Sequence, residues 1–98
     1  MANKRRLDFK VLREEIRIEQ VCDWLGIAMK KSGTQLRGAC PICQHDSARC
    51  LVVTPALNRF WCFGGCQRGG DVIELVAQAK QLSHKDAARL LADHFGKR

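Results

Sequence analysis

The sequence predicts an α+β domain in which a small antiparallel β-sheet of about four short strands is flanked by N-terminal and C-terminal helices. Both ends of the 98-residue chain carry apolar residues at helical spacing. The middle contains short β-branched and aromatic stretches separated by glycine and proline, which are typical of strands and turns. Two close pairs of cysteines enclose the last of these stretches. We expect one domain, 1–98, with helices in 7–26, a ribbon in 27–70 and two helices in 71–96.

The N-terminal helical region is expected to be broken. One set of apolar positions ends at Ile16, and a second set that begins at Ile18 is out of phase with the first. A bend is therefore predicted between these two residues. Gly26 is expected to close the second helix. Cys22 lies on the apolar side of that helix, where a thiol is more often a small hydrophobic packing residue than a metal ligand.

The ribbon is expected to consist of short strands joined by tight turns. Two of them should lie within 27–39 around a turn at Gly33, followed by strands at 51–54 and 59–63. Pro55 and Asn58 lie between the last two and indicate a hairpin turn. Cys50 extends the third strand and is expected in the core.

The C-terminal region carries two helix-start signals. Asp71 with Glu74 three residues later is a capping-box arrangement, and Ser83 with Asp86 forms the second start. Apolar positions recur at helical spacing after each signal. Gly96 is expected to end the last helix.

The two cysteine pairs predict a metal site. They are separated by 18 residues and comprise Cys40 with Cys43 and Cys62 with Cys66. Two such pairs brought together give the tetrahedral thiolate set that zinc prefers, so one zinc ion per chain is expected in a zinc ribbon. The second pair contains one additional residue, which two glycines accommodate. His45 is an alternative ligand, and buried thiols without metal are the less favoured interpretation.

The charge of the chain is strongly basic. The formal net charge is +7, and residues 27–70 contain a single acid, Asp46. The basic residues of this segment are Lys30, Lys31, Arg37, Arg49, Arg59 and Arg68. A polyanionic partner is the simplest interpretation, with solubility charge as the alternative.

Several classes of function are not favoured. No apolar run approaches the ~20 residues of a membrane span, and the N-terminus leads into a helical pattern rather than a signal peptide. A cytoplasmic protein with reduced thiols is expected. The acidic residues are explained by helix caps and solvated helix faces, so the chain is expected to lack a polymerase site of its own. A zinc bound by four cysteines also has no open position for water.

The motifs together resemble the CHC-type zinc-binding domain of bacterial and phage DNA primases. The matching stretches are Val21-Cys22-Asp23-Trp24-Leu25-Gly26-Ile27, Lys30-Lys31-Ser32-Gly33, Arg37-Gly38-Ala39-Cys40-Pro41-Ile42-Cys43, Arg59-Phe60-Trp61-Cys62-Phe63-Gly64 and Gly69-Gly70-Asp71-Val72-Ile73-Glu74-Leu75-Val76. They occur in the order of the family and cover most of the chain. Many cellular primases have histidine as the second ligand, whereas this chain has Cys43.

The resemblance implies a template-reading domain that contacts single-stranded DNA during replication priming. The six basic residues of the ribbon are the expected phosphate contacts, and Trp61 is the expected stacking ring. Phe60 and Trp61 are adjacent on one strand and point to opposite faces, so one is expected in the core; both could also be buried. A primase catalytic domain or a replicative helicase is a candidate partner of the expected monomer.

Two other functions remain open at this point. The first is a stand-alone zinc-ribbon adaptor or regulator of a phage or mobile element, which binds DNA or a replication protein. The second is an interaction module in which zinc only stabilises the fold. A thiol redox enzyme is the least favoured, because zinc-bound cysteines are poor nucleophiles.

Overall fold

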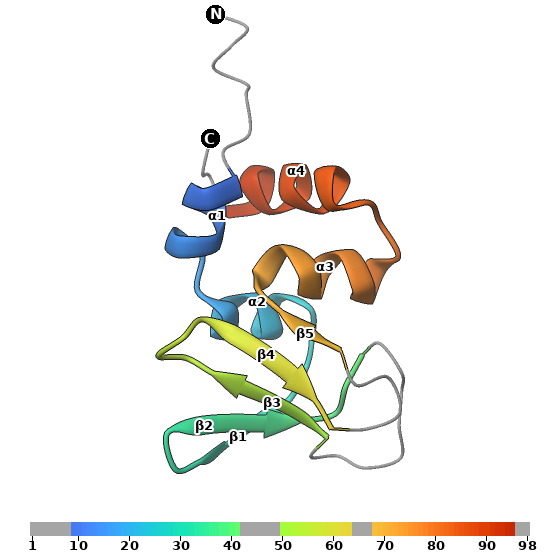
Figure 1. Cartoon of the computed structure of the whole chain (residues 1–98). Coiled ribbons are helices and arrows are strands. Elements are labelled where there is room, and N and C mark those ends of the chain that lie inside the picture. Colours follow the sequence, from blue (N-terminus) through green and yellow to red (C-terminus); the bar gives the residue numbers. More distant parts are fainter. Residues whose placement is uncertain (1–8, 42–49, 64–67, 96–98) are drawn as a thin grey trace, which may run out of the picture.

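The computed structural model describes residues 9–41, 50–63 and 68–95, and consists of a layer of helices packed on one face of a β-sheet (Figure 1). The elements are α1 (Phe9–Glu15), α2 (Ile18–Trp24), β1 (Met29–Ser32), β2 (Gln35–Gly38), β3 (Leu51–Thr54), β4 (Arg59–Cys62), β5 (Gly69–Gly70), α3 (Val72–Lys80) and α4 (His84–Phe95). None of the helices in these ranges is long and apolar enough to cross a bilayer.

Within the described ranges, the sheet has five strands in the order β1-β2-β3-β4-β5, and every neighbouring pair is antiparallel. The predicted antiparallel ribbon between terminal helices is therefore confirmed. The turn between β1 and β2 contains Gly33 with a positive φ of 65°, at the position that the sequence indicates. The short strand β5 was not predicted from the sequence.

The missed strand consists of Gly69 and Gly70, which pair with Trp61 and Phe60 of β4. Two glycines carry no β-sheet signal in a sequence, because they have no side chain to pack on a pleated surface. Glycine is required here because neighbouring side chains approach the backbone of this strand closely. A Cβ atom on Gly69 would lie only 2.4 Å from Cε3 of Trp61, so the Trp61 indole occupies the space above this strand.

The hydrophobic core lies between the helices and the inner face of the sheet. Alternation along β3 and β4 places Leu51, Val53 and Phe60 on this inner face, and all three are buried. Helix α3 covers them with five buried residues, Val72, Ile73, Leu75, Val76 and Ala77. Helix α4 packs against α3, on the side of α3 that faces away from the sheet (Figure 1).

The predicted break between α1 and α2 is confirmed, and its backbone groups are satisfied by a residue distant in sequence. Asn58, in the β3–β4 turn, accepts a hydrogen bond through Oδ1 from the Ile18 N–H at 2.7 Å. Its Nδ2 donates to the carbonyls of Arg13 and Ile16, both at 2.8 Å. Arg17, which precedes α2, provides no side-chain cap to that helix. Asn58 therefore acts as a cap supplied from the sheet.

The same turn makes a second connection to the helical break. The Arg17 guanidinium donates a hydrogen bond to the carbonyl of Pro55. Asn58 has a positive φ of 56°, a conformation that asparagine adopts more readily than most residues. The turn conformation and the polar side chain thus act together to attach the hairpin to the helices.

Helix α2 ends as predicted at Gly26. The N–H of Gly26 bonds to the carbonyl of Asp23 and the N–H of Ile27 bonds to that of Cys22, which is the Schellman arrangement. The φ of Gly26 is 80°, where glycine is favoured.

The predicted starts of α3 and α4 are also observed. The Asp71 carboxylate accepts from the Glu74 N–H at 3.0 Å, and the Ser83 hydroxyl accepts from the Asp86 N–H at 3.1 Å. The Glu74 carboxylate binds Gln78 and His84. The hydrogen bond from His84, at 2.6 Å, lowers the pKa of Glu74 below its ordinary value of 4.5, with smaller contributions from Gln78 and Arg68.

Replacing Asn58 should separate the helical break from the hairpin. Asn58→Gly keeps the positive φ accessible but removes the partner of three backbone groups, two of them in buried hydrogen bonds, so the free energy of unfolding should fall by about 2–4 kcal/mol. Leu57→Ala, at the neighbouring exposed position, is the control and should cost less than about 0.5 kcal/mol. Urea titration with zinc in excess measures both values. An Asn58→Gly protein as stable as the control would contradict the role of this side chain.

The Glu74–His84 contact predicts a specific loss of stability in acid. Because the pKa of Glu74 is lowered by folding, its contribution is complete above pH 4.5 and is lost as the pH falls through the folded value. Between pH 6 and pH 3, the wild type should therefore lose more unfolding free energy than Glu74→Gln. The difference between the two proteins removes the common pH dependence of zinc binding, and Glu14→Gln serves as the exposed control. Parallel curves for Glu74→Gln and wild type would refute the linkage.

Candidate metal centre and nucleic-acid interface

Two of the four predicted zinc ligands lie at one end of the sheet. Cys40 follows β2 and Cys62 ends β4, and the two side chains are 2% and 0% exposed. Gly38 and Cys62 both pair with Leu51 of the intervening strand, which brings the two chain segments to the same end. Cys43, Cys66 and the alternative ligand His45 lie outside the described residues.

The observed part of this centre fits a soft divalent metal. Buried thiols converging at the end of a ribbon are the donors that structural zinc uses. Among the residues described, no group of three or more cysteine, histidine or carboxylate side chains is placed to hold a metal, and the predicted set includes two residues beyond them.

The remaining cysteines differ in their relation to this end of the sheet. Cys22 is fully buried on α2, and burial, followed by the charge of Glu19, raises the pKa of its thiol to about 12. It therefore stays protonated, as suits a packing residue. Cys50 is buried as predicted, but its Sγ accepts a hydrogen bond from the Cys40 N–H at 3.4 Å. No local pattern in the sequence indicates this contact.

Gly38 fixes the approach of β1 to the strand that leads into Cys40. A Cβ at this position would lie 2.5 Å from the carbonyl oxygen of Ala28 and 2.6 Å from the sulfur of Met29. The Arg-Gly-x-Cys part of the motif thus has a packing reason, because only glycine lets the two backbones come this close.

The outer face of the sheet carries the basic and aromatic side chains. The pairing register aligns Lys30, Arg37, Val52, Trp61 and Gly69 in one row across all five strands. Residues in such a row share a face of the sheet. This outer face is opposite to the inner face, which holds Leu51, Val53 and Phe60 at the alternate positions of β3 and β4. Arg59, two residues before Trp61, lies on this outer face as well.

Two exposed aromatic rings project from the outer face. Trp61 is 42% exposed and Phe63 is 64% exposed, whereas Phe60 is 4% exposed. The Trp61 and Phe63 rings meet edge to face with centroids 6.3 Å apart. The guanidinium carbon of Arg37 lies 6.0 Å from the Phe63 centroid, within range of a cation–π contact. Trp61 is therefore the surface ring that the sequence favoured, and Phe63 is a second one that it missed.

Phe63 could have been found from its spacing. It lies two residues after Trp61, so an extended chain places both side chains on the same face.

The structure separates the six predicted basic residues into groups. Lys30, Arg37 and Arg59 belong to the outer face. Lys31 is exposed but alternates to the other face of β1. Arg68 is exposed beside β5 and acts on Glu74 of α3, whose pKa it helps to lower. Arg49 lies outside the described residues.

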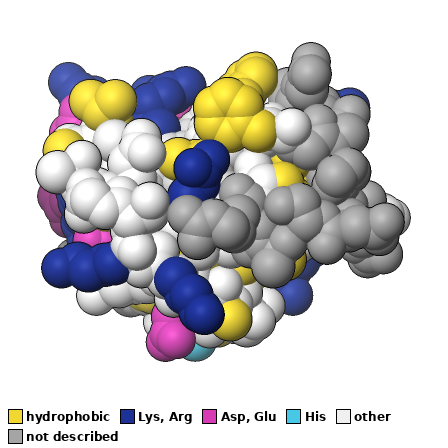
Figure 2. Space-filling view, turned by 90° about the horizontal axis from the view of Figure 1, so that it is seen from below, with side chains coloured by type: hydrophobic (Ala, Val, Ile, Leu, Met, Phe, Trp, Pro, Cys, Tyr) yellow, Lys and Arg dark blue, Asp and Glu magenta, His cyan; other side chains and the backbone are white. Residues whose placement is uncertain are grey.

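On the surface seen from below, Lys and Arg predominate among the charged side chains of the described residues (Figure 2). Lys and Arg side chains are spread over it beside exposed hydrophobic groups, and the acidic side chains lie towards its margin. This combination suits a polyanion with flat apolar groups, because cations attract phosphates and rings provide stacking surfaces.

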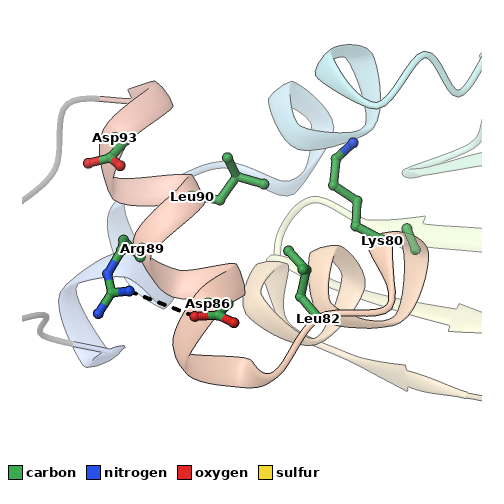
Figure 3. Close-up of a pocket in the computed structure, with 7 residues that line it drawn as sticks. Lys80, Leu82, Asp86, Arg89, Leu90 and Asp93 are labelled. Carbon is green, nitrogen blue, oxygen red and sulfur yellow. Dashed lines mark ion pairs between the residues drawn. The ribbon is translucent and has the colours of Figure 1, made fainter.

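A hollow on the helical side has a different character. It has a volume of about 710 Å³ between α3 and α4, with Leu82 and Leu90 among its lining residues (Figure 3). Asp86 and Arg89 form an ion pair at 3.8 Å at its edge. Charges of both signs surround it, so its electrostatics do not select an anion.

The fold and the cysteines define a zinc ribbon covered by helices on one face, and the comparisons with known proteins assign it to a family. Residues 4–98 match the family model described as the CHC2 zinc finger, so the chain belongs to this family. DNA primases carry the same domain. The DNA primase of Mycolicibacterium smegmatis is 36% identical over 92 residues, and that of Aquifex aeolicus is 35% identical over 92 residues.

A solved structure agrees with this assignment. The crystal structure of the Aquifex aeolicus primase, containing its zinc-binding and RNA polymerase domains, superimposes with a TM-score of 0.82 at 35% identity. The match covers 94% of this chain and 22% of that one. The chain also spans only 14% and 18% of the Mycolicibacterium smegmatis and Aquifex aeolicus primases, respectively. The resemblance to the primase zinc-binding domain is thus confirmed, and zinc binding follows as a property of the family.

Proposed function

We propose that this domain binds single-stranded DNA on the outer face of its sheet and presents the template for primer synthesis. The observation that carries the proposal is the coincidence of three cations and two exposed rings on one face. Lys30, Arg37 and Arg59 provide phosphate contacts, and Trp61 with Phe63 provides stacking surfaces. Primer synthesis itself belongs to a primase catalytic domain as partner.

The platform is well suited to hold a base because its main ring is already fixed. The Trp61 indole packs over Gly69 on one side and against Phe63 at its edge, so little side-chain freedom is lost on binding. Arg37 is positioned by its contact with Phe63. Preorganised contacts of this kind raise affinity without a larger interface.

One zinc ion held by Cys40, Cys43, Cys62 and Cys66 is the structural support of this face in our proposal. The zinc would join the ends of β2 and β4 and so hold Arg37 and Trp61 at their spacing. A site with four thiolates is closed to water, so the metal supplies folding energy rather than catalysis.

Zinc binding can be tested ligand by ligand. The purified protein should contain one zinc per chain, and replacing any of the four proposed cysteines by serine should lose it and unfold the ribbon. The matched controls are the two other buried thiols, and Cys22→Ala and Cys50→Ala should keep the metal. Elemental analysis and circular dichroism measure both effects. If His45→Ala loses zinc while Cys66→Ser retains it, the ligand set is wrong.

DNA binding can be tested with two adjacent lysines. The side chains of Lys30 and Lys31 lie on opposite faces of β1. Lys30→Gln should therefore reduce the salt dependence of binding, whereas Lys31→Gln should leave it nearly unchanged. Each phosphate contact contributes a slope of about −0.7 in log affinity against log salt on a single strand. Fluorescence titration of an oligonucleotide at several salt concentrations gives these slopes.

The stacking role of Trp61 has a separate signature. Trp61→Leu should weaken binding by ~1–3 kcal/mol with little change in the salt slope, because it removes a ring and no charge. In a Trp24→Phe protein that retains Trp61, the fluorescence comes from Trp61 alone. Its quenching by the oligonucleotide then reports contact with this ring. If the zinc-loaded protein binds no single-stranded DNA, the domain acts instead as a protein-interaction module.

A further inference from the structure

A second hollow adjoins the basic row of the sheet near the cysteine end. It lies between the α2–β1 connection and the residues that follow β2, and has a volume of about 550 Å³. Its described walls include Leu25, Ile27, Ala28 and Pro41, with Lys30 and Arg37 as its cations. The proposed zinc ligand Cys40 also borders it. Among the described residues that line it, none is a carboxylate.

The two cations of this hollow are arranged unfavourably for the domain alone. Lys30 and Arg37 are directly opposed on β1 and β2, and like charges in that position destabilise a sheet. The Nε of Arg37 is also buried and has no hydrogen-bond partner in the part of the chain that the structure describes. An unpaired buried donor costs free energy unless an acceptor is supplied. An anionic group at the mouth of the hollow would relieve the repulsion between the two like charges.

The apolar walls define the rest of the ligand. An inorganic anion would leave Leu25, Ile27 and Pro41 without a partner, whereas a nucleotide combines an anionic phosphate with a flat, largely apolar base. The hollow between α3 and α4 is larger but mixes Asp86 and Asp93 with its cations, so it does not offer the same selection.

We propose that this hollow receives one unstacked base of the bound strand, with the adjoining phosphate held by Lys30 and Arg37. The inference rests on the proposed function and extends it from a flat stacking face to a face with a base pocket. The row from Lys30 to Trp61 crosses three inter-strand spacings, about 14 Å. A single strand therefore stacks one base on Trp61 and inserts another into the hollow a few nucleotides away.

The test fills the hollow without removing a charge. Ala28 lines it and is exposed, so Ala28→Leu should block a base while the fold and zinc content remain unchanged. Ala56→Leu places the same substitution at an exposed position in the β3–β4 turn and is the matched control. The probes are the shortest oligonucleotide with full affinity and a set of copies in which one nucleotide at a time lacks its base.

In the wild type, loss of the base should weaken binding about tenfold at two positions, one for Trp61 and one for the hollow. Ala28→Leu should abolish only the second sensitivity and keep the quenching of Trp61, whereas Ala56→Leu should keep both. If Ala28→Leu shows the wild-type pattern at every position, the base pocket is refuted and the stacking function stands. Failure of the wild type to quench or bind at all refutes the DNA-binding function itself.

Discussion

Asn58 joins the two layers of the molecule through three hydrogen bonds to one helical break. Its side chain satisfies the start of α2 and two carbonyls at the end of α1, while its backbone forms the turn between β3 and β4. A break between two helices normally leaves several backbone groups to water. Here the sheet supplies their partners, so the position of the helices and the position of the hairpin are set by the same residue.

The hairpin is consequently attached to the helices at its turn, and its other end lies where we propose the zinc site. Asn58 attaches the turn, and the opposite end carries Cys62 next to the segment of Cys40. Between these points, strand alternation sends Phe60 into the core and Trp61 to the surface. A slip by one residue would exchange the buried and exposed rings, and the attachment of the turn through Asn58 opposes it. The proposed zinc would provide a second fixed point. The chemical character of the outer face thus depends on contacts made at the hairpin ends.

Much of this architecture could be predicted because its signals are local. The helical break followed from the phase of Ile16 and Ile18, and the turn followed from Pro55 and Asn58. The fifth strand could not, because Gly69 is selected by the Trp61 ring above it and not by β propensity. Pairing across the sheet also determines three other features. These are the division of the basic residues between the faces, the contact of Cys50 with Cys40 and the hydrogen bonds of Asn58. Composition and periodicity contain no information on that register.

The two edges of the sheet have a further consequence for how the molecule behaves towards its own copies. An edge strand offers unpaired backbone groups to any other strand, and long, flat edges promote aggregation. One edge here is β5, which is two residues long, and the other is β1, which carries Lys30 and Lys31 side by side. A short edge limits the number of intermolecular hydrogen bonds, and adjacent positive charges repel an identical strand. The sheet can thus expose Trp61 and Phe63 on its face while its edges oppose growth into fibrils.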